Sequence, residues 1–122
     1  MADAPDPDVV AAARAVSRRS GAPVVVTLGP HGMVVAGEDG CWHAAPPDVV
    51  QGNPTGAGDS AVAAVVRGLV HRETWPEILA EAVAVAAAAV ASPVAGELDL
   101  ERYESWRSAV PVRAVESFVP RW

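Results

Sequence analysis

The sequence predicts an α/β fold from two neighbouring segments close to the N-terminus. A helical pattern of apolar residues occupies positions 7–20, and the β-branched run Pro23-Val-Val-Val-Thr-Leu28 follows it almost at once. A continuous apolar run of this kind is typical of a strand buried on both faces of a parallel sheet. A helix followed by a buried strand is the repeating unit of α/β folds. The 122 residues are expected to form one domain or part of one.

The first helix carries signals at both of its ends. Asp6 is the expected N-cap, Pro7 stands at the first helical position, and Ser20-Gly21 closes the helix. Four apolar residues at helical spacing are expected to form its buried face: Val9, Val10, Ala13 and Val16.

A β-hairpin is expected after the first strand. The apolar segments 33–36 and 41–45 flank the turn-rich spacer Gly37-Glu-Asp-Gly40. We expect this hairpin at the border of the sheet, next to one parallel strand. One parallel strand and a hairpin are fewer strands than an independent doubly wound fold usually has.

Two apolar helices are expected further along the chain. The first runs from Ser60 to about Val70 and contains Gly68, which is expected to permit close packing. The second begins at the capping-box sequence Thr74-Trp-Pro-Glu77 and ends before Ser92-Pro93. Both are interpreted as buried helices.

Asp99 is the expected cap of a third, more amphipathic helix after the loop. Leu100, Tyr103 and Trp106 have helical spacing in that helix and are expected to contact the core. The chain thus predicts a hairpin with three to four helices.

The charge pattern argues against nucleic acid as a partner. The net charge is −6, and all nine basic residues are arginines. Binding to a phosphate backbone requires clustered Lys and Arg on one surface. The lack of lysine also excludes a Walker A motif, which needs a lysine at the phosphates.

Cysteine usage and hydropathy point to the cytoplasm. Cys41 is the single cysteine, cannot form an internal disulfide, and is expected to be buried and inert. The N-terminus is acidic, unlike a signal peptide, and the apolar run 82–91 is too short for a bilayer that requires about 20 residues. No membrane partner is expected. His31, His43 and His71 lack metal-ligand spacing, so no metal site is predicted.

The segment Asn53-Pro-Thr-Gly-Ala-Gly-Asp-Ser60 is the most informative part of the chain. Gly56 and Gly58 allow successive amides to turn toward one anion, and the start of the apolar helix adds unpaired amides and the positive end of its dipole. Asp59 would then lie beside the anion and orient an attacking hydroxyl, as phosphoryl transfer requires. The structural alternatives are an N-cap for Asp59 and a tight turn for the glycines.

A second glycine-containing segment, Thr27-Leu-Gly-Pro-His-Gly-Met33, follows the first strand. Thr27 is at the C-terminal end of that strand, where α/β folds place ligands, and Gly29 and Gly32 would let the backbone pass close to a nucleotide. The alternative is an ordinary turn between strands. His31 is expected to face solvent.

These two segments and a third, 84–97, resemble the ribokinase-like, PfkB-type carbohydrate kinases. The segment 53–60 is similar to the C-terminal signature of that family, and 27–33 is similar to its nucleotide-side turn. The segment 84–97 is most similar to 1-phosphofructokinases and tagatose-6-phosphate kinases. The resemblance spans about residues 8–115 and implies the C-terminal part of a ribokinase-like doubly wound sheet.

The resemblance also implies roles for individual residues. Asp59 corresponds to the family's catalytic base, and Gly56, Ala57 and Gly58 correspond to its anion hole. The nucleotide-binding positions implied are Thr27, Gly29, Gly32, Asn53 and Thr55. The alanine-rich helix around 84–88 would border adenine, although close helix packing alone also accounts for its alanines.

The resemblance implies ATP with Mg²⁺ as cofactor, the Mg²⁺ arriving with the nucleotide; the family's magnesium-linked motif belongs to the N-terminal half that this chain lacks. A sugar phosphate is the implied acceptor, with fructose 1-phosphate preferred. A Rossmann-type dehydrogenase is disfavoured because the third glycine of the dinucleotide motif is lacking.

Family members run to roughly 300 residues, about two ordinary domain lengths. The whole chain, 1–122, therefore resembles a partial kinase domain without the N-terminal half that carries the substrate site and lid, and Met1 need not be the true start. Two functions stay open: ATP-dependent phosphoryl transfer to a sugar phosphate hydroxyl, or a non-catalytic truncated remnant that binds nucleotide weakly or only associates. The partner expected is a second copy in a homodimer or the missing N-terminal half.

Overall fold

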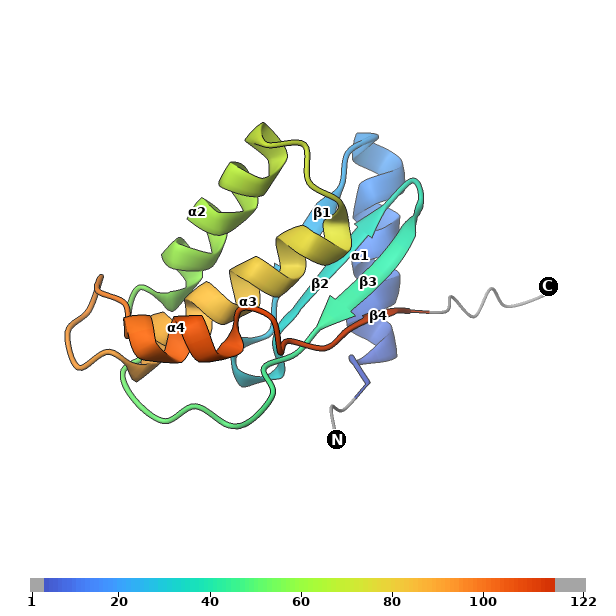
Figure 1. Cartoon of the computed structure of the whole chain (residues 1–122). Coiled ribbons are helices and arrows are strands. Elements are labelled where there is room, and N and C mark those ends of the chain that lie inside the picture. Colours follow the sequence, from blue (N-terminus) through green and yellow to red (C-terminus); the bar gives the residue numbers. More distant parts are fainter. Residues whose placement is uncertain (1–3, 116–122) are drawn as a thin grey trace.

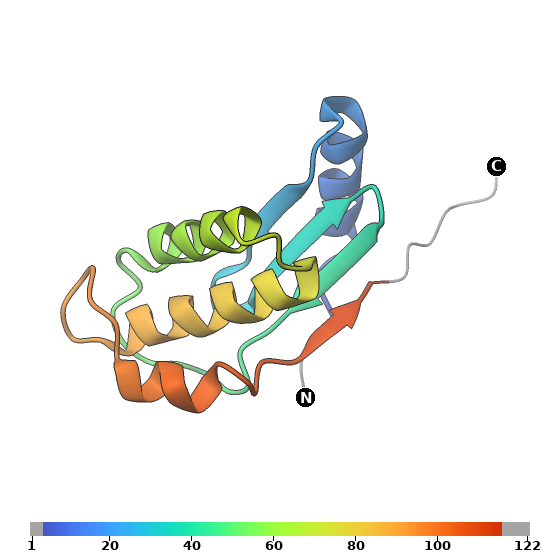
Figure 2. The same ribbon diagram turned by 45° about the horizontal axis from the view of Figure 1, so that its top comes forward.

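The computed structural model describes residues 4–115, which form three layers. One helix covers one face of a four-stranded sheet, and two helices cover the other face (Figures 1 and 2). The helices are α1 (Pro7–Ser20), α2 (Ala57–Val70), α3 (Trp75–Ala91) and α4 (Leu100–Trp106), of which α1 lies alone on its face and α4 packs against α3. The strands are β1 (Val24–Thr27), β2 (Met33–Gly37), β3 (Gly40–Ala44) and β4 (Val112–Ala114). The mixed α/β class predicted from the sequence is confirmed.

The sheet has the order β1-β2-β3-β4, and each neighbouring pair is antiparallel. The parallel pairing expected for β1 is therefore wrong among the described residues. Only five residues separate Thr27 from Met33, which it faces across the ladder, whereas a parallel pair needs a crossover of a dozen or more. The expectation of burial on both faces was also wrong for β1, which is an edge strand with half-buried valines. The strand buried on both faces is β2.

The hairpin of β2 and β3 is confirmed, but its expected place at the border of the sheet is wrong. β4, which the sequence did not predict, pairs with β3, so the hairpin forms the centre of the sheet. Alternation along β2 explains its complete burial: Met33 and Val35 face α2 and α3, whereas Val34 and Ala36 face α1.

The ends of α1 and α3 are as expected. The side chain of Asp6 accepts a hydrogen bond from the amide of Asp8, and Gly21 takes a left-handed conformation at φ 70°. Thr74 and Glu77 form a reciprocal capping box at the start of α3. On α1, Val10 and Ala13 are buried as predicted, whereas Val16 is exposed.

Helix α2 begins at Ala57, three residues before the predicted start, because Gly56 acts as its N-cap. Near its other end the helix contacts α3 where Gly68 meets Ile78, which confirms the close packing expected there. Asp99 caps α4 by accepting from the amide of Arg102. In α4, Trp106 is buried as expected, but Leu100 is exposed.

Cys41 is buried beneath α1, as expected, and this burial raises the pKa of its thiol. A raised thiol pKa keeps the group protonated and weakly nucleophilic. Among residues 4–115, no helix combines the length and the apolar character needed to cross a membrane.

Candidate functional site

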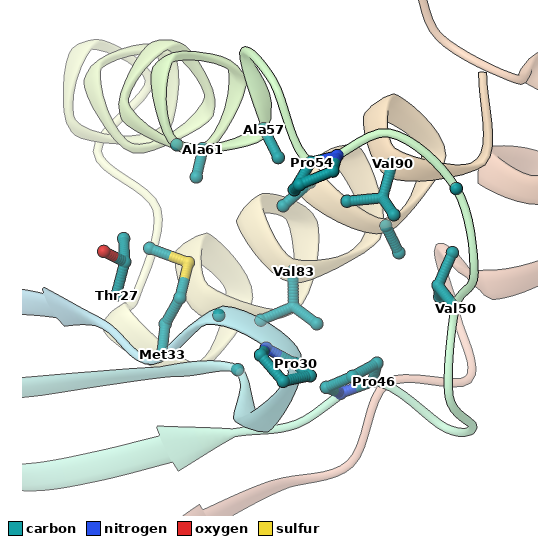
Figure 3. Close-up of a pocket in the computed structure, with 16 residues that line it drawn as sticks. Thr27, Pro30, Met33, Pro46, Val50, Pro54, Ala57, Ala61, Val83 and Val90 are labelled. Carbon is teal, nitrogen blue, oxygen red and sulfur yellow. The ribbon is translucent and has the colours of Figure 1, made fainter. Parts of the chain in front are cut away.

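A cavity of about 380 Å³ opens between the end of the sheet, the N-terminus of α2 and one side of α3 (Figure 3). Ala61, Met33 and Val83 project into it from α2, β2 and α3, respectively. The full lining comprises Thr27, Gly29, Pro30, Gly32, Met33, Pro46, Val50, Gly52, Pro54, Ala57, Gly58, Ala61, Val83, Ala86, Ala87 and Val90. No charged side chain belongs to this lining, so apart from Thr27 the cavity presents apolar side chains and glycine backbone.

The loop before α2 is attached to the last turns of α3. The amide of Asn53 donates to the carbonyl of Val90 at 2.9 Å, and the Asn53 Oδ1 accepts from the amide of Thr55 at 3.0 Å. Gly52 passes so close to α3 that a Cβ there would lie 1.9 Å from the Val90 oxygen. These contacts hold the chain in place as it enters the glycine segment.

Gly56 turns the chain into α2 with φ 85°, a conformation that side chains disfavour. The amide of Ala57 donates to the carbonyl of Pro54 at 3.1 Å, so this member of the predicted anion hole is already bonded internally. The amides of Gly56, Gly58 and Asp59 have no protein acceptor within residues 4–115. They lie at the positive end of a 14-residue helix. The helix start therefore offers three free donors to an anion.

Asp59 lies in the first turn of α2 and is exposed. The N-cap alternative for Asp59 does not apply, because Gly56 occupies the cap position and no hydrogen bond or ion pair of the Asp59 carboxylate is found in the described part of the chain. Asp59 is not part of the cavity lining; it follows the lining residue Gly58 directly. Its carboxylate is thus free to accept a proton or a hydrogen bond beside the free amides.

The second glycine segment forms the opposite wall of the cavity. Thr27 ends β1, and Gly29 and Pro30 belong to η1 (Gly29–His31), the 3₁₀ turn between β1 and β2. Gly32 packs against the end of β3, where a Cβ would lie 1.9 Å from the Ala44 oxygen. The His31 side chain is exposed, as expected.

The fold brings together five of the predicted site residues, and these line one cavity: Thr27, Gly29, Gly32, Ala57 and Gly58. The other four do not line it. Asn53 and Thr55 form the turn that leads into the glycines, and Gly56 and Asp59 lie at the start of the helix.

Several lining residues were not predicted. On α3, Ala86 and Ala87 fall within the predicted alanine-rich wall, whereas Ala84 and Ala88 are completely buried in the core. Val83 and Val90 were missed, although they share one helical face with Ala86 and Ala87, and this spacing of three to four residues is visible in the sequence. Met33 lies on β2, and Pro46 and Val50 lie between β3 and α2; no local sequence pattern could have assigned these three residues to the cavity lining.

The site combines a mostly apolar cavity with the free amide of Gly58 in its lining, next to the free amides of Gly56 and Asp59. Since no basic side chain lines the cavity, an anion there would be held by amides and the dipole of α2. An apolar group linked to an anionic group would match both features.

Comparison with known proteins identifies the family of this chain. The pfkB family carbohydrate kinase profile matches residues 1–101. The chain is 40% identical to the 1-phosphofructokinase of Escherichia coli strain K12 over 92 residues, which cover 75% of this chain and 30% of that protein. A 1-phosphofructokinase from Shigella flexneri matches to the same extent. The chain thus spans just under a third of the length of these curated relatives.

Solved structures show the same fold. Phosphofructokinase-2 from Escherichia coli in complex with potassium matches with a TM-score of 0.77 and 28% identity, covering 88% of this chain and 35% of that one. The tetrameric inhibited form of the same enzyme matches with a TM-score of 0.71 and 29% identity, covering 88% of this chain and 34% of that one. The profile match over most of the sequence is decisive: the chain belongs to the pfkB family of carbohydrate kinases.

Proposed function

We propose that this chain supplies the nucleotide site and the catalytic base for ATP-dependent phosphoryl transfer to a sugar phosphate hydroxyl, in the cytoplasm. Fructose 1-phosphate is the preferred acceptor, because the curated relatives at 40% identity are 1-phosphofructokinases. One observation carries the proposal: a single cavity joins an apolar slot to the amide of Gly58, which is free of internal bonding.

The adenine ring would occupy the slot between Val83, Ala86 and Met33. The phosphates of ATP would extend toward the start of α2 and accept hydrogen bonds from the amides of Gly56, Gly58 and Asp59. The amide of Ala57 would not take part, since it is bonded to Pro54. Mg²⁺ would accompany the phosphates.

Asp59 would orient the acceptor hydroxyl and take its proton. Phosphoryl transfer passes through a loose transition state, so the hydroxyl needs orientation early and loses its proton late. An exposed carboxylate without an internal partner is suited to this role, because nothing in the described protein competes for its oxygens.

The test is a chimaera in which residues 8–115 replace the matching segment of the Escherichia coli 1-phosphofructokinase. We expect a chimaera that phosphorylates fructose 1-phosphate in an ATP-coupled assay. Asp59→Asn should lower turnover by roughly 10²- to 10⁴-fold, the usual contribution of a positioned base. Asp39→Asn, in the exposed hairpin turn, is the matched control and should leave turnover unchanged. Equal turnover in the Asp59→Asn chimaera and its parent would refute the role.

The alternative is a chain that has no activity of its own and acts through association. The observation that favours it is an apolar surface on α2, here called the α2 stripe, formed by Val62, Val66, Leu69 and Val70, each more than half exposed. The neighbouring strand β1 also has a free edge among the described residues. The partner would be a second copy of the chain or a polypeptide that supplies the rest of the kinase fold.

An ATP-coupled assay on the purified chain separates the two functions. Phosphorylated product from this polypeptide alone would exclude the non-catalytic alternative. Product that forms only after addition of a polypeptide covering the rest of the kinase fold would support association as the route to activity.

A further inference from the structure

A buried histidine on the α1 side of the sheet bonds to the turn that forms one wall of the cavity. His43 lies on β3 with only 5% of its surface exposed. Its Nε2 lies 2.9 Å from the backbone carbonyl oxygen of His31 in the turn η1, and a bond to a carbonyl requires the Nε2–H tautomer. The bond joins the centre of the sheet to the turn that forms one wall of the cavity.

His43 cannot touch a ligand in the cavity. Side chains alternate along β3, so Cys41 and His43 face α1, whereas Trp42 and Ala44 face α2 and α3. The cavity opens on the side of α2 and α3, and His43 is not part of its lining. Any effect of His43 on a ligand must therefore pass through the turn.

The turn has its own short-range bonds and is attached both to the flanking strands β1 and β2 and to β3. Leu28 donates to Gly32, His31 to Leu28, and Gly32 to Gly29, at 2.8–3.2 Å. These bonds set the shape of the turn. The paired ends of β1 and β2 hold the base of the turn, and the close approach of Gly32 to Ala44 and the bond from His43 attach its other residues to β3. Loss of the imidazole would leave the part-buried His31 carbonyl without its protein donor.

We propose that His43 is a positioning residue for nucleotide binding, which holds the carbonyl of His31 and thereby fixes the wall formed by Gly29, Pro30 and Gly32. This rests on the proposed function, because the ligand is taken to be ATP. Histidine is required here only as a donor at the right reach, so a side chain with an N–H at the same distance should replace it.

The experiment compares three variants of the full chain in ATP titrations by calorimetry. His43→Leu removes the donor and should weaken ATP binding by roughly 3- to 10-fold, the range expected for one net hydrogen bond. His43→Gln keeps an N–H near the Nε2 position and should restore most of the affinity. Cys41→Ala changes a buried residue on the same strand and the same face, away from the turn, and should bind as the parent does.

Amide hydrogen exchange provides the second measurement, because a merely structural role would not confine the effect to the turn. The amides of His31 and Gly32, which are bonded within the turn, should exchange faster in His43→Leu and regain protection in His43→Gln. Unchanged affinity in His43→Leu, or a Gln variant as weak as the Leu variant, would overturn the proposal.

Failure of the proposed function gives a different result. If the parent chain does not bind ATP, the nucleotide assignment is wrong, and the exchange measurement alone decides whether His43 holds the turn. Equal exchange of the His31 and Gly32 amides in the parent and in His43→Leu would then reject that contact as well.

Discussion

Two glycines of the site have different physical roles. Gly56 takes φ 85° and turns the chain into α2, so a side chain there would be strained. Gly58 has no such conformation, and a Cβ built on it meets nothing within 4 Å. The backbone therefore does not require glycine at position 58. What glycine provides there is open space beside a free amide on the cavity wall.

Gly58→Ala should consequently separate binding from folding. The added methyl group occupies the space that phosphates would use, so ATP affinity should fall about 10-fold or more, an estimate based on the loss of one or two charge-assisted hydrogen bonds. The free energy of unfolding should stay equal or rise by up to about 1 kcal/mol, because alanine favours helix. Calorimetric titration and urea unfolding measure the two quantities.

Adenosine is the control ligand for this variant. It lacks phosphates, so its weaker binding should be the same in Gly58→Ala and the parent. An ATP affinity that does not change would mean that the phosphates lie elsewhere.

At the scale of the elements, α2 and α3 pack closely at the ends that lie away from the cavity. Gly68 allows the two helices to approach until a Cβ at this position would lie 2.5 Å from Cγ1 of Ile78. Ile78 is 1% exposed and β-branched, so its side chain has little freedom to move away. The cavity lies between the other ends of the same two helices, at Ala57 and Val90.

Gly68→Ala should therefore destabilise the protein, although the same substitution at position 58 should not. Overpacking costs about 1–3 kcal/mol, which exceeds the helix gain of at most about 1 kcal/mol. Urea unfolding of the two variants, made in one helix with one added methyl group, is a direct comparison. An unfolding free energy for Gly68→Ala equal to that of Gly58→Ala would contradict the packing described here.

Helix α4 is joined to α3 by a bond from the Tyr103 hydroxyl to the Glu81 carboxylate. This bond, and to a lesser degree burial, raises the pKa of Tyr103 above its ordinary value. A group with a raised pKa in the folded state stabilises the fold fully below its unfolded pKa, here about 10, and loses that effect as pH rises through the folded value.

Tyr103→Phe should accordingly cost about 1 kcal/mol near neutral pH and progressively less as the pH rises above about 10. Urea unfolding of both proteins across this pH range tests the trend. Tyr103 is the only tyrosine of the chain, so the ultraviolet absorbance of tyrosinate reports its ionisation directly. A stability difference that is constant in pH would mean that the bond does not contribute.

At the scale of the whole molecule, the chain covers 30% of the length of its curated relatives, yet it encloses a cavity with five of the predicted site residues.

Part of the surface of the chain is apolar and exposed to solvent. The α2 stripe places four large apolar side chains in solvent on a helix whose inner face contacts α3. A contiguous apolar surface of this kind favours association.

Val66→Glu should reduce self-association or binding to a complementing polypeptide by about 10-fold or more, since it places a charge where a buried valine would contribute about 1.5–3 kcal/mol. Val16→Glu on α1 is the matched control, because both valines are 53% exposed and Val16 lies outside the stripe. Sedimentation velocity measures the change. Identical behaviour of the two variants would exclude the α2 stripe as the contact surface.

The sequence by itself determined the features that depend on a few neighbouring residues. The capping residues Asp6, Thr74 and Asp99 and the hairpin were all assigned correctly from local signals. Such signals succeed because a cap or a tight turn is satisfied within one helical turn of chain.

Only the tertiary structure decided how these pieces meet. It placed β1 at an antiparallel edge, added β4 to the sheet, left Leu100 in solvent, and brought His43 to the back of the cavity. Strand order and the choice between core and cavity depend on contacts between residues far apart in the sequence, where burial outweighs local preference. For that reason the sequence pointed to the glycines of the candidate site, whereas the fold decided that Val83 and Val90 line the cavity and that Asn53 lies outside the lining, in the turn that leads into it.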